Sequence, residues 1–194
     1  MRVPWVLVAV LVAGCASPPS PSGRALVTDG FEAGLTVWGA GHAVPGDAGN
    51  ASGWLVSRSY ERAVEGNASA RFEVDGSHGT ATLWLQRPVP AAPDEARDVR
   101  LSLQASSDAA GADIVLYAGF DPPGNATAFI ADAPDHAAGR HALAAGSNWQ
   151  PEAFTWAMPT HGNATVWVAL GLTTTEAARV VVFMDDVRIE LQPA

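Results

Sequence analysis

Apart from its first residues, the chain shows no sustained apolar repeat of 3.6 residues, which is the pattern of an amphipathic helix. Several segments instead alternate apolar and polar positions or run through β-branched residues, and Gly, Pro, Asn and Asp bound them. The clearest predicted strands are residues 68–74, 80–89, 99–105, 113–119, 154–158, 165–172 and 179–191. Weaker patterns predict strands at residues 25–28, 35–44, 54–57 and 128–131.

About ten short strands separated by turns are typical of an all-β protein built as an antiparallel β-sandwich. The predicted strands lie within residues 24–194, which we expect to form a single β-sandwich domain without internal repeats. Residues 132–148 are rich in Ala, Gly and His, and they are predicted to form a long loop.

The first residues have the pattern of a secretory signal peptide. Arg2 precedes an apolar run that ends before Cys15 and is shorter than the roughly 20 residues of a membrane-spanning helix. Residues 12–15, Val-Ala-Gly-Cys, resemble the lipobox of prokaryotic lipoproteins. The resemblance implies that residues 1–14 are a lipoprotein signal peptide, that Cys15 is lipidated, and that residues 15–23 tether the domain to the membrane. A lipidated protein is expected at the cell surface. The alternative to a lipobox is an ordinary signal peptide, in which Cys15 is only a small residue near the cleavage site.

Composition narrows the classes of partner and of fold. The chain has 194 residues, a formal net charge of −9 and a pI near 4.8, so nucleic acid is not an expected partner. A single cysteine excludes a fold held by disulfides. The oligomeric state has no signature in the sequence.

Four of the five asparagines begin an Asn-Ala-Ser or Asn-Ala-Thr sequon, and a glycine precedes each of them. This pattern predicts N-glycosylation at Asn50, Asn67, Asn125 and Asn163. The alternative is that Gly-Asn is simply good turn chemistry, although this does not explain the hydroxyl residue two positions later.

Three segments together indicate a family. They are residues 27–34 (VTDGFEAG, followed by Trp38), residues 61–72 (ERAVEGNASARF) and residues 182–189 (VFMDDVRI). Their order resembles that of carbohydrate-binding modules with the jelly-roll fold of the galactose-binding-like superfamily. The resemblance implies that the first and last strands lie side by side, which would bring residues 30–32 close to Asp185 and Asp186. It also implies a structural calcium ion at that place.

The phase of the last strand supports a buried carboxylate. Val181, Phe183, Val187, Ile189 and Leu191 are expected on one face, with Asp185 in the middle of the series. A buried carboxylate is costly unless it is paired or bound to a metal. Calcium prefers six to eight oxygen ligands. We therefore expect Asp29, Glu32 and Asp185 to bind calcium, together with carbonyl oxygens near Thr28 and Ser69. The alternatives are an ion pair of Asp185 with Arg71, or hydrogen bonds to turn amides.

A sugar-binding surface needs flat aromatic side chains and polar groups that recognise hydroxyls. Trp84 and Gln86 alternate with leucines in their strand, and Trp167 is out of phase with the valines beside it. Trp84, Trp167 and Gln86 are therefore the predicted ligand-binding residues. Further candidates are Arg100 and Gln104 as hydroxyl-binding groups, and the loop tryptophans Trp38, Trp54 and Trp149. The alternative is that these tryptophans are structural.

The sequence carries no catalytic signature. It has no Gly-x-Ser-x-Gly motif, and the spacing of His136 and His141 with Asp132 and Asp135 matches no known metal motif. We therefore expect a cell-surface lipoprotein that is not an enzyme and that binds glycan or another extracellular ligand. The alternative is a structural or adhesive module of the cell envelope that contacts proteins.

Overall fold

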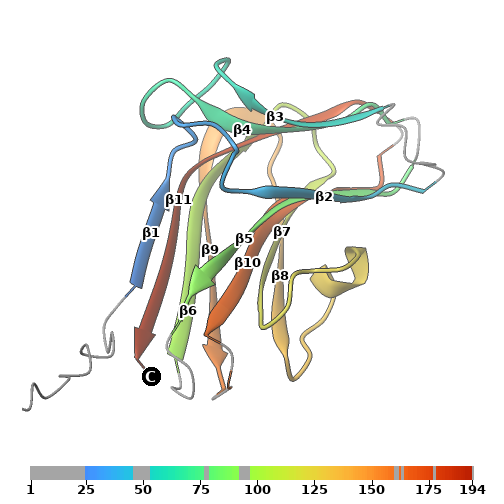
Figure 1. The fold of residues 1–194 in the computed structure, drawn as a ribbon. Coiled ribbons are helices and arrows are strands. Elements are labelled where there is room, and N and C mark those ends of the chain that lie inside the picture. The colour runs from blue at the N-terminus through green and yellow to red at the C-terminus, as the bar shows by residue number, and fades with distance from the viewer. Residues whose placement is uncertain are drawn as a thin grey trace, which may run out of the picture.

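The computed structural model describes residues 25–45, 53–76, 79–91, 97–159, 162, 164–176 and 178–193. These residues form two antiparallel β-sheets that pack face to face (Figure 1). The antiparallel β-sandwich predicted from the sequence is confirmed. The predictions for residues 1–24, which include Cys15, and those for Asn50 and Asn163 lie outside the described residues.

One sheet has six strands, and its longest strand, β11, lies at the centre. Its path is β3 (Trp54–Ser59), β4 (Ser69–Val74), β11 (Val180–Pro193), β6 (Arg97–Ser107) and β9 (Gly146–Met158), and β1 (Ala25–Asp29) also pairs with β11. The first and last described strands therefore lie side by side, as the resemblance implied (Figure 1).

The other sheet has five strands. Its order is β2 (Gly39–Ala43), β5 (Ala81–Pro90), β10 (Thr165–Thr174), β7 (Ala112–Gly119) and β8 (His136–Ala142). Alternation sets its two faces, since Leu83 and Leu85 of β5 and Leu170 of β10 point into the main core between the sheets. Trp84 and Val115 belong to a separate cluster on the outer face, which is the face turned away from the other sheet.

The predicted phase of β11 is wrong in its first half. Val180, Val182 and Met184 belong to the main core, whereas Phe183 does not. From Val187 onward the odd-numbered residues face the core, as predicted. A β-bulge between Asp185 and Arg188 inserts one extra residue and reverses the alternation, and Asp186 takes a left-handed conformation with φ of 48°.

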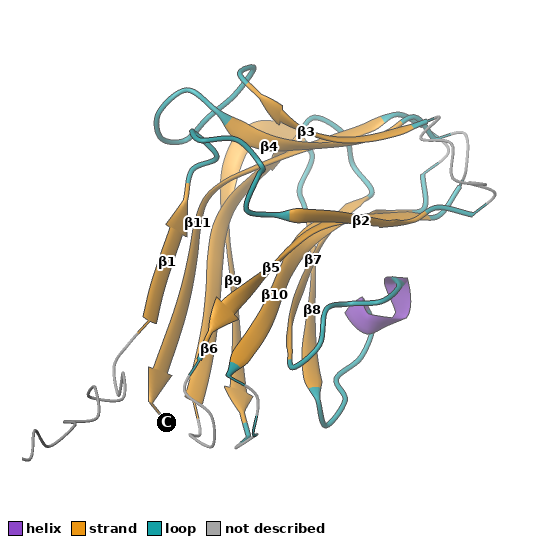
Figure 2. Ribbon diagram, viewed as in Figure 1, coloured by secondary structure: helices purple, strands orange, loops and turns teal. Residues whose placement is uncertain are grey.

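The connection between β7 and β8 also differs from the prediction. The expected strand at residues 128–131 is replaced by a short 3-10 helix, η1 (Ala126–Phe129), which Asn125 caps through its side chain (Figure 2). The expected loop at residues 132–148 contains β8, because pairing with β7 outweighs the weak strand propensity of its Ala, Gly and His residues. In the described part of the chain, no helix is long and apolar enough to cross a membrane.

Candidate functional site

The bulge in β11 lies at a gap in the six-stranded sheet. β4 pairs with residues 180–184 of β11, and β1 pairs with residues 187–191 on the same side. Between these two partners β11 has no strand neighbour on that side. The turn after β1 and the loop of residues 60–68 come together here, which is the place where the sequence predicted a metal site.

Asp185 lies at this gap and is fully buried. One carboxylate oxygen, Oδ2, accepts hydrogen bonds from the backbone N–H groups of Val64 at 2.7 Å and Glu65 at 3.2 Å, and Oδ1 accepts one from Asp186 at 2.8 Å. No cation among the described residues pairs with Asp185. Burial raises the pKa of this carboxyl group, and the three N–H donors partly oppose the rise.

Glu32 binds the end of the loop of residues 60–68. Its Oε1 accepts hydrogen bonds from the N–H groups of Asn67 at 2.7 Å and Ala68 at 2.8 Å, which lower its pKa. Gly66 has φ of +69°, and a Cβ atom there would lie 2.3 Å from Glu32 Oε1. A side chain at this position would strain the left-handed backbone and would displace the Glu32 carboxylate, which favours glycine here.

Asp29 ends β1 and organises the following turn. Its two oxygens accept hydrogen bonds from the N–H of Phe31 at 2.7 Å and from the indole Nε1 of Trp38 at 2.8 Å. Trp38 is 6% exposed and belongs to the main core. Trp38 is therefore a structural residue, in line with the alternative considered for the tryptophans.

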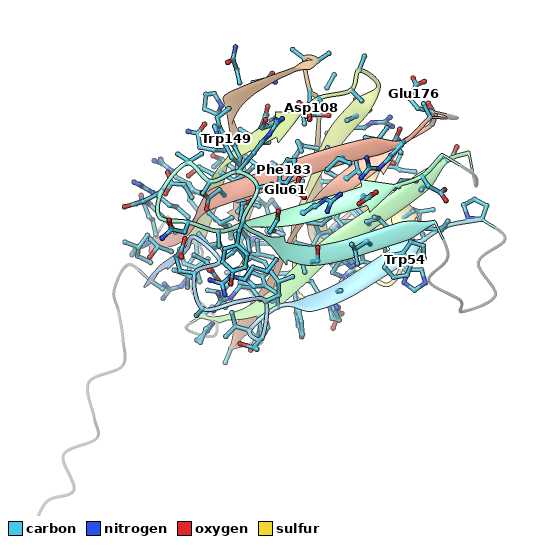
Figure 3. All side chains as sticks on the ribbon, turned by 90° about the horizontal axis from the view of Figure 1, so that it is seen from above. Trp54, Glu61, Asp108, Trp149, Glu176 and Phe183 are labelled. Carbon is cyan, nitrogen blue, oxygen red and sulfur yellow. The ribbon has the colours of Figure 1, made fainter. Side chains whose placement is uncertain are left out.

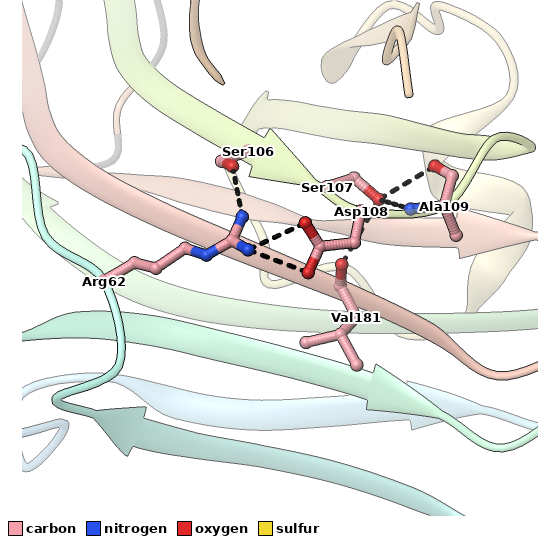
Figure 4. A network of polar contacts seen from close by, with 6 residues as sticks. All are labelled: Arg62, Ser106, Ser107, Asp108, Ala109 and Val181. Atoms are coloured by element: carbon pink, nitrogen blue, oxygen red, sulfur yellow. Dashed lines mark hydrogen bonds and ion pairs between the residues drawn. The ribbon is translucent and has the colours of Figure 1, made fainter. Parts of the chain in front are cut away.

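The loop of residues 60–68 is also held from the outer face of the six-stranded sheet (Figure 4). Arg62 donates hydrogen bonds to both oxygens of Asp108, at 2.7 and 2.9 Å, and to Ser106 Oγ at 3.1 Å. Its guanidinium lies 5.3 Å from the centre of the Phe183 ring, and its carbonyl accepts a hydrogen bond from the buried Ser69. These contacts fix the loop that supplies the N–H groups to Asp185.

The ion pair of Asp185 with Arg71, considered as one alternative, does not form. Arg71 pairs with Glu61 at 3.3 Å and with Glu73 at 2.6 Å. The other alternative, hydrogen bonds from turn amides to Asp185, is present in the structure.

A pocket of about 420 Å³ opens beside these carboxylates. It is lined by Thr28, Asp29, Gly30, Glu32, Glu65, Gly66 and Asp186. Two of the predicted calcium ligands, Asp29 and Glu32, face it, but both oxygens of Asp29 and Oε1 of Glu32 already accept N–H donors, and Asp185 is not part of its lining. Within the described ranges, no three His, Cys, Asp or Glu side chains converge as metal ligands. The side chains therefore fit calcium only in part, and carbonyl oxygens would have to complete its coordination.

The second candidate surface is the outer face of the five-stranded sheet. Trp84 of β5 and Tyr117 of β7 lie there, and the ring of Phe129 from η1 covers both. The centre of the Phe129 ring is 5.4 Å from that of Trp84 and 5.9 Å from that of Tyr117. Val115 and Ala169 complete this outer cluster. Trp84 is 3% exposed, so it offers no open platform while Phe129 covers it.

The other predicted ligand-binding residues lie next to this outer cluster. Trp167 of β10 is partly buried and packs against it. Gln86 accepts a hydrogen bond from Trp84 Nε1 at 2.9 Å through its amide oxygen. Arg100 and Gln104, by contrast, lie in β6 of the six-stranded sheet, because the chain crosses between the sheets after β5. Those two residues cannot serve the surface formed by Trp84 and Trp167.

The other two tryptophans that the sequence proposed as ligand-binding candidates, Trp54 and Trp149, lie far from each other. Trp54 is in β3 and Trp149 is in β9, the two edge strands of the six-stranded sheet, and Figure 3 shows them on opposite sides of the molecule. Trp54 stacks on His42, with ring centres 4.2 Å apart. The three loop tryptophans named from the sequence therefore do not line one common binding edge.

The histidines near the end of η1 also do not converge. His136 pairs with Asp135 at 2.9 Å and stacks on Tyr117, whereas His141 pairs with Glu152 at 2.5 Å. The two histidines lie on β8 with a spacing that places them on opposite faces of the sheet.

Sequence reasoning missed Tyr117 and Phe129. Alternation in β7 could have identified Tyr117, because Ile114 and Leu116 face the core and Tyr117 lies on the opposite face. Burial raises the pKa of Tyr117 to about 12, so its hydroxyl stays protonated and donates to the carbonyl of Asp121 at 2.7 Å. No local pattern could have placed Phe129 on the sheet, because its contact depends on how the connection folds back.

Two of the predicted glycosylation sites are described. Asn67 and Asn125 are both exposed. Asn125 Oδ1 accepts hydrogen bonds from the N–H of Thr127 at 2.9 Å and from its hydroxyl at 2.5 Å, whereas the Ser69 hydroxyl of the Asn67 sequon is buried.

Replacing Asp185 by Asn tests the importance of the buried carboxylate. An amide NH2 group must then face backbone N–H donors, so we expect the free energy of unfolding to fall by about 1–3 kcal/mol in urea titrations. The matched control is Asp186→Asn at the neighbouring, less buried carboxyl group, and we expect a smaller effect there.

The same variant tests the pKa of Asp185. Because the folded-state pKa lies above the ordinary value of 3.8, the stabilisation from this proton is complete below that value and is lost as the pH rises through the folded-state pKa. Relative to Asp185→Asn, the parent should therefore lose stability as the pH rises through this acidic range. An unchanged difference between the two proteins across the range would contradict the raised pKa.

Comparison with known proteins shows the fold. No protein-family model matches the chain, and no curated protein matches it in sequence. Among solved structures, it is similar to TmCBM61 in complex with β-1,4-galactotriose, with 15% identity over 85% of this chain and 94% of that chain and a TM-score of 0.54. It is also similar to the K1 adhesin domain of Lys-gingipain from Porphyromonas gingivalis W83, with 18% identity, coverage of 85% and 97%, and a TM-score of 0.54. A third similar structure is a family 16 carbohydrate-binding module, with 15% identity, coverage of 82% and 94%, and a TM-score of 0.50. The chain thus shares the β-sandwich fold of carbohydrate-binding modules.

Proposed function

We propose that this protein is a non-catalytic module that binds glycan on the outer face of its five-stranded sheet. The observation that carries the proposal is the position of Trp84, Tyr117 and Trp167 on three adjacent strands, on the face turned away from the main core. Phe129 covers Trp84 and Tyr117, whereas Trp167 stays partly accessible, so part of this aromatic face is open to a ligand.

The chemistry of this face suits a sugar. Aromatic rings pack against the apolar face of a pyranose, and planar amides recognise its hydroxyl groups. Trp167 is the partly accessible ring, and Gln86 lies beside the aromatic residues. The Gln86 amide oxygen is taken by Trp84, so its NH2 group would donate to a sugar hydroxyl.

The similar structures support the proposal through their fold. TmCBM61 was solved with a galactose oligosaccharide, and the family 16 structure is a carbohydrate-binding module. A domain of a bacteriophage tailspike described as enzymatically active also shares the fold, with a TM-score of 0.53 over 20% of that chain. We place the protein with the binding modules, because in its described part His136, His141 and Tyr117 are each engaged in separate contacts.

Glycan-array binding followed by calorimetry on each bound glycan tests the proposal. We expect Trp167→Ala to weaken binding by about tenfold, or about 1.4 kcal/mol, through loss of ring packing. Gln86→Ala should weaken it less. The control is Tyr60→Ala, which removes an aromatic ring that is 68% exposed and lies at the end of β3 in the other sheet.

If no glycan binds at high micromolar concentration, the alternative gains support. The protein would then be a structural or adhesive envelope module that contacts other proteins, a possibility that the similarity to a gingipain adhesin domain favours. If Trp167→Ala and Tyr60→Ala reduce the affinity for glycan equally, the glycan does not bind on the outer face of the five-stranded sheet.

We further propose that the protein is a lipoprotein held at the cell surface through Cys15 and that its sequons carry glycans. The support is the lipobox-like end of the apolar segment and the four Asn-Ala-Ser/Thr sequons. In the native host, Cys15→Ser should move the protein from the membrane fraction to the soluble fraction. Intact mass should show a diacylglyceryl group and attached glycan in the parent, and peptide mapping should find the glycan at Asn67 or Asn125. An unmodified mature mass would contradict both modifications.

We also propose a structural calcium ion beside Asp29, Glu32 and Asp185. The support is that four acidic residues, Asp29, Glu32, Glu65 and Asp186, line the pocket, with the buried Asp185 next to Asp186 in the chain. Titration calorimetry should show heat when calcium is added to the metal-free parent and none with Asp185→Ala. The absence of heat in the parent protein would rule out the ion.

A further inference from the structure

The outer cluster can be divided into a floor and a cover. Trp84, Tyr117 and Trp167 belong to the sheet and form the floor, which we call the aromatic shelf. Phe129 covers it from the connection between β7 and β8. We call residues 122–131 of this connection the η1 arm; Figure 2 shows its helix beside the five-stranded sheet.

Two glycines let the ring of Trp84 lie close to the backbone of the sheet. The indole of Trp84 lies over Gly41 of the neighbouring strand β2, where a Cβ atom would come within 2.2 to 2.5 Å of three indole atoms. Gly171, the partner of Trp84 on β10, likewise leaves no room for a side chain, because a Cβ atom there would lie 2.9 Å from Trp84 Cβ. The ring therefore lies close to the sheet, and the Phe129 ring, tilted by 53°, packs against it.

The η1 arm is fastened to the sheet at its two ends. At the first end, Phe120 N–H donates to the carbonyl of Asp135 at 3.1 Å, and Tyr117 donates to Asp121. At the second end, Ala133 and His136 exchange two backbone hydrogen bonds.

Between these ends, the hydrogen bonds of the described arm are all local. They join Asn125 to Thr127 and Ala128, and Thr127 to Ile130. No hydrogen bond between described residues joins residues 122–131 to the sheet. Apolar packing, centred on Phe129, is what holds the middle of the arm in place.

We propose that Phe129 is an internal occupant of the aromatic shelf and that a glycan competes with it for Trp84. This inference rests on the proposed glycan-binding function and adds its regulation. A phenyl ring and a pyranose ring both have six members and present an apolar face, so they can use the same aromatic surface. The η1 arm must swing away about its fastened ends before a sugar ring can pack on Trp84.

The consequence is a lowered apparent affinity. When only a fraction of the molecules has the shelf uncovered, the apparent dissociation constant is the intrinsic constant divided by that fraction. Removing the Phe129 ring raises the uncovered fraction without changing the shelf itself. Phe129→Ala should therefore bind glycan more tightly than the parent protein, which is the opposite of the effect expected for a residue that contacts the sugar.

The test compares the parent protein, Phe129→Ala and Ile130→Ala on a printed array of plant and microbial glycans that includes β-1,4-galactotriose, with calorimetry on every bound glycan. Ile130 is the matched control, because it is the next residue of the arm and is 71% exposed. We expect Phe129→Ala to bind at least about tenfold more tightly, Ile130→Ala to match the parent, and Phe129→Ala/Trp84→Ala to lose the gain. If Phe129→Ala does not fold, Phe129→Gln keeps more side-chain volume than alanine and replaces the apolar ring with a group that prefers water.

Two negative outcomes are distinguishable. If the parent binds a glycan and Phe129→Ala binds it equally or more weakly, competition by Phe129 is overturned, while the proposed glycan-binding function stands. If neither protein binds any glycan, the proposed function fails, and the competition falls with it.

Discussion

The buried carboxylate of Asp185 is the contact on which the architecture at this end of the sandwich depends. It lies where β11 passes from β4 to β1 as its neighbour, and it accepts backbone N–H groups from the loop of residues 60–68. Glu32 and Asp29 do the same for the adjoining segments. Unpaired backbone groups at such a gap are costly, and the three carboxylates satisfy them without adding another strand.

The two sides of the five-stranded sheet show how one alternating pattern can serve stability and binding together. Leu83, Leu85 and Leu170 fill the main core on one side. On the other side, Trp84 and Tyr117 form a smaller apolar layer that the ring of Phe129 covers. No hydrogen bond between described residues joins the middle of the covering η1 arm to the sheet, so this small layer is easier to open than the core, and a binding surface can exist there without weakening the sandwich.

Much of the fold could be predicted because alternation is a local property. The strong strands and the outward position of Trp84 and Trp167 follow from short segments of sequence, whereas the pairing of the first and last strands was implied only by the family resemblance. β8 could not be predicted, because its Ala- and Gly-rich residues become a strand only when β7 offers hydrogen bonds. The bulge at Asp185 escaped prediction for a related reason, since it depends on the change of neighbouring strand along β11.

In regular strands the sequence by itself determined which side chains share a face, because there it depends only on whether positions are odd or even; in β11 the bulge breaks this rule. It also marked Asp29, Glu32 and Asp185 as unusual acidic groups. Only the tertiary structure decided that Arg100 and Gln104 lie on the other sheet, that backbone amides satisfy Asp185, and that Phe129 covers Trp84. These facts depend on which distant segments meet, and contacts between distant segments arise from packing of the whole domain rather than from any local pattern.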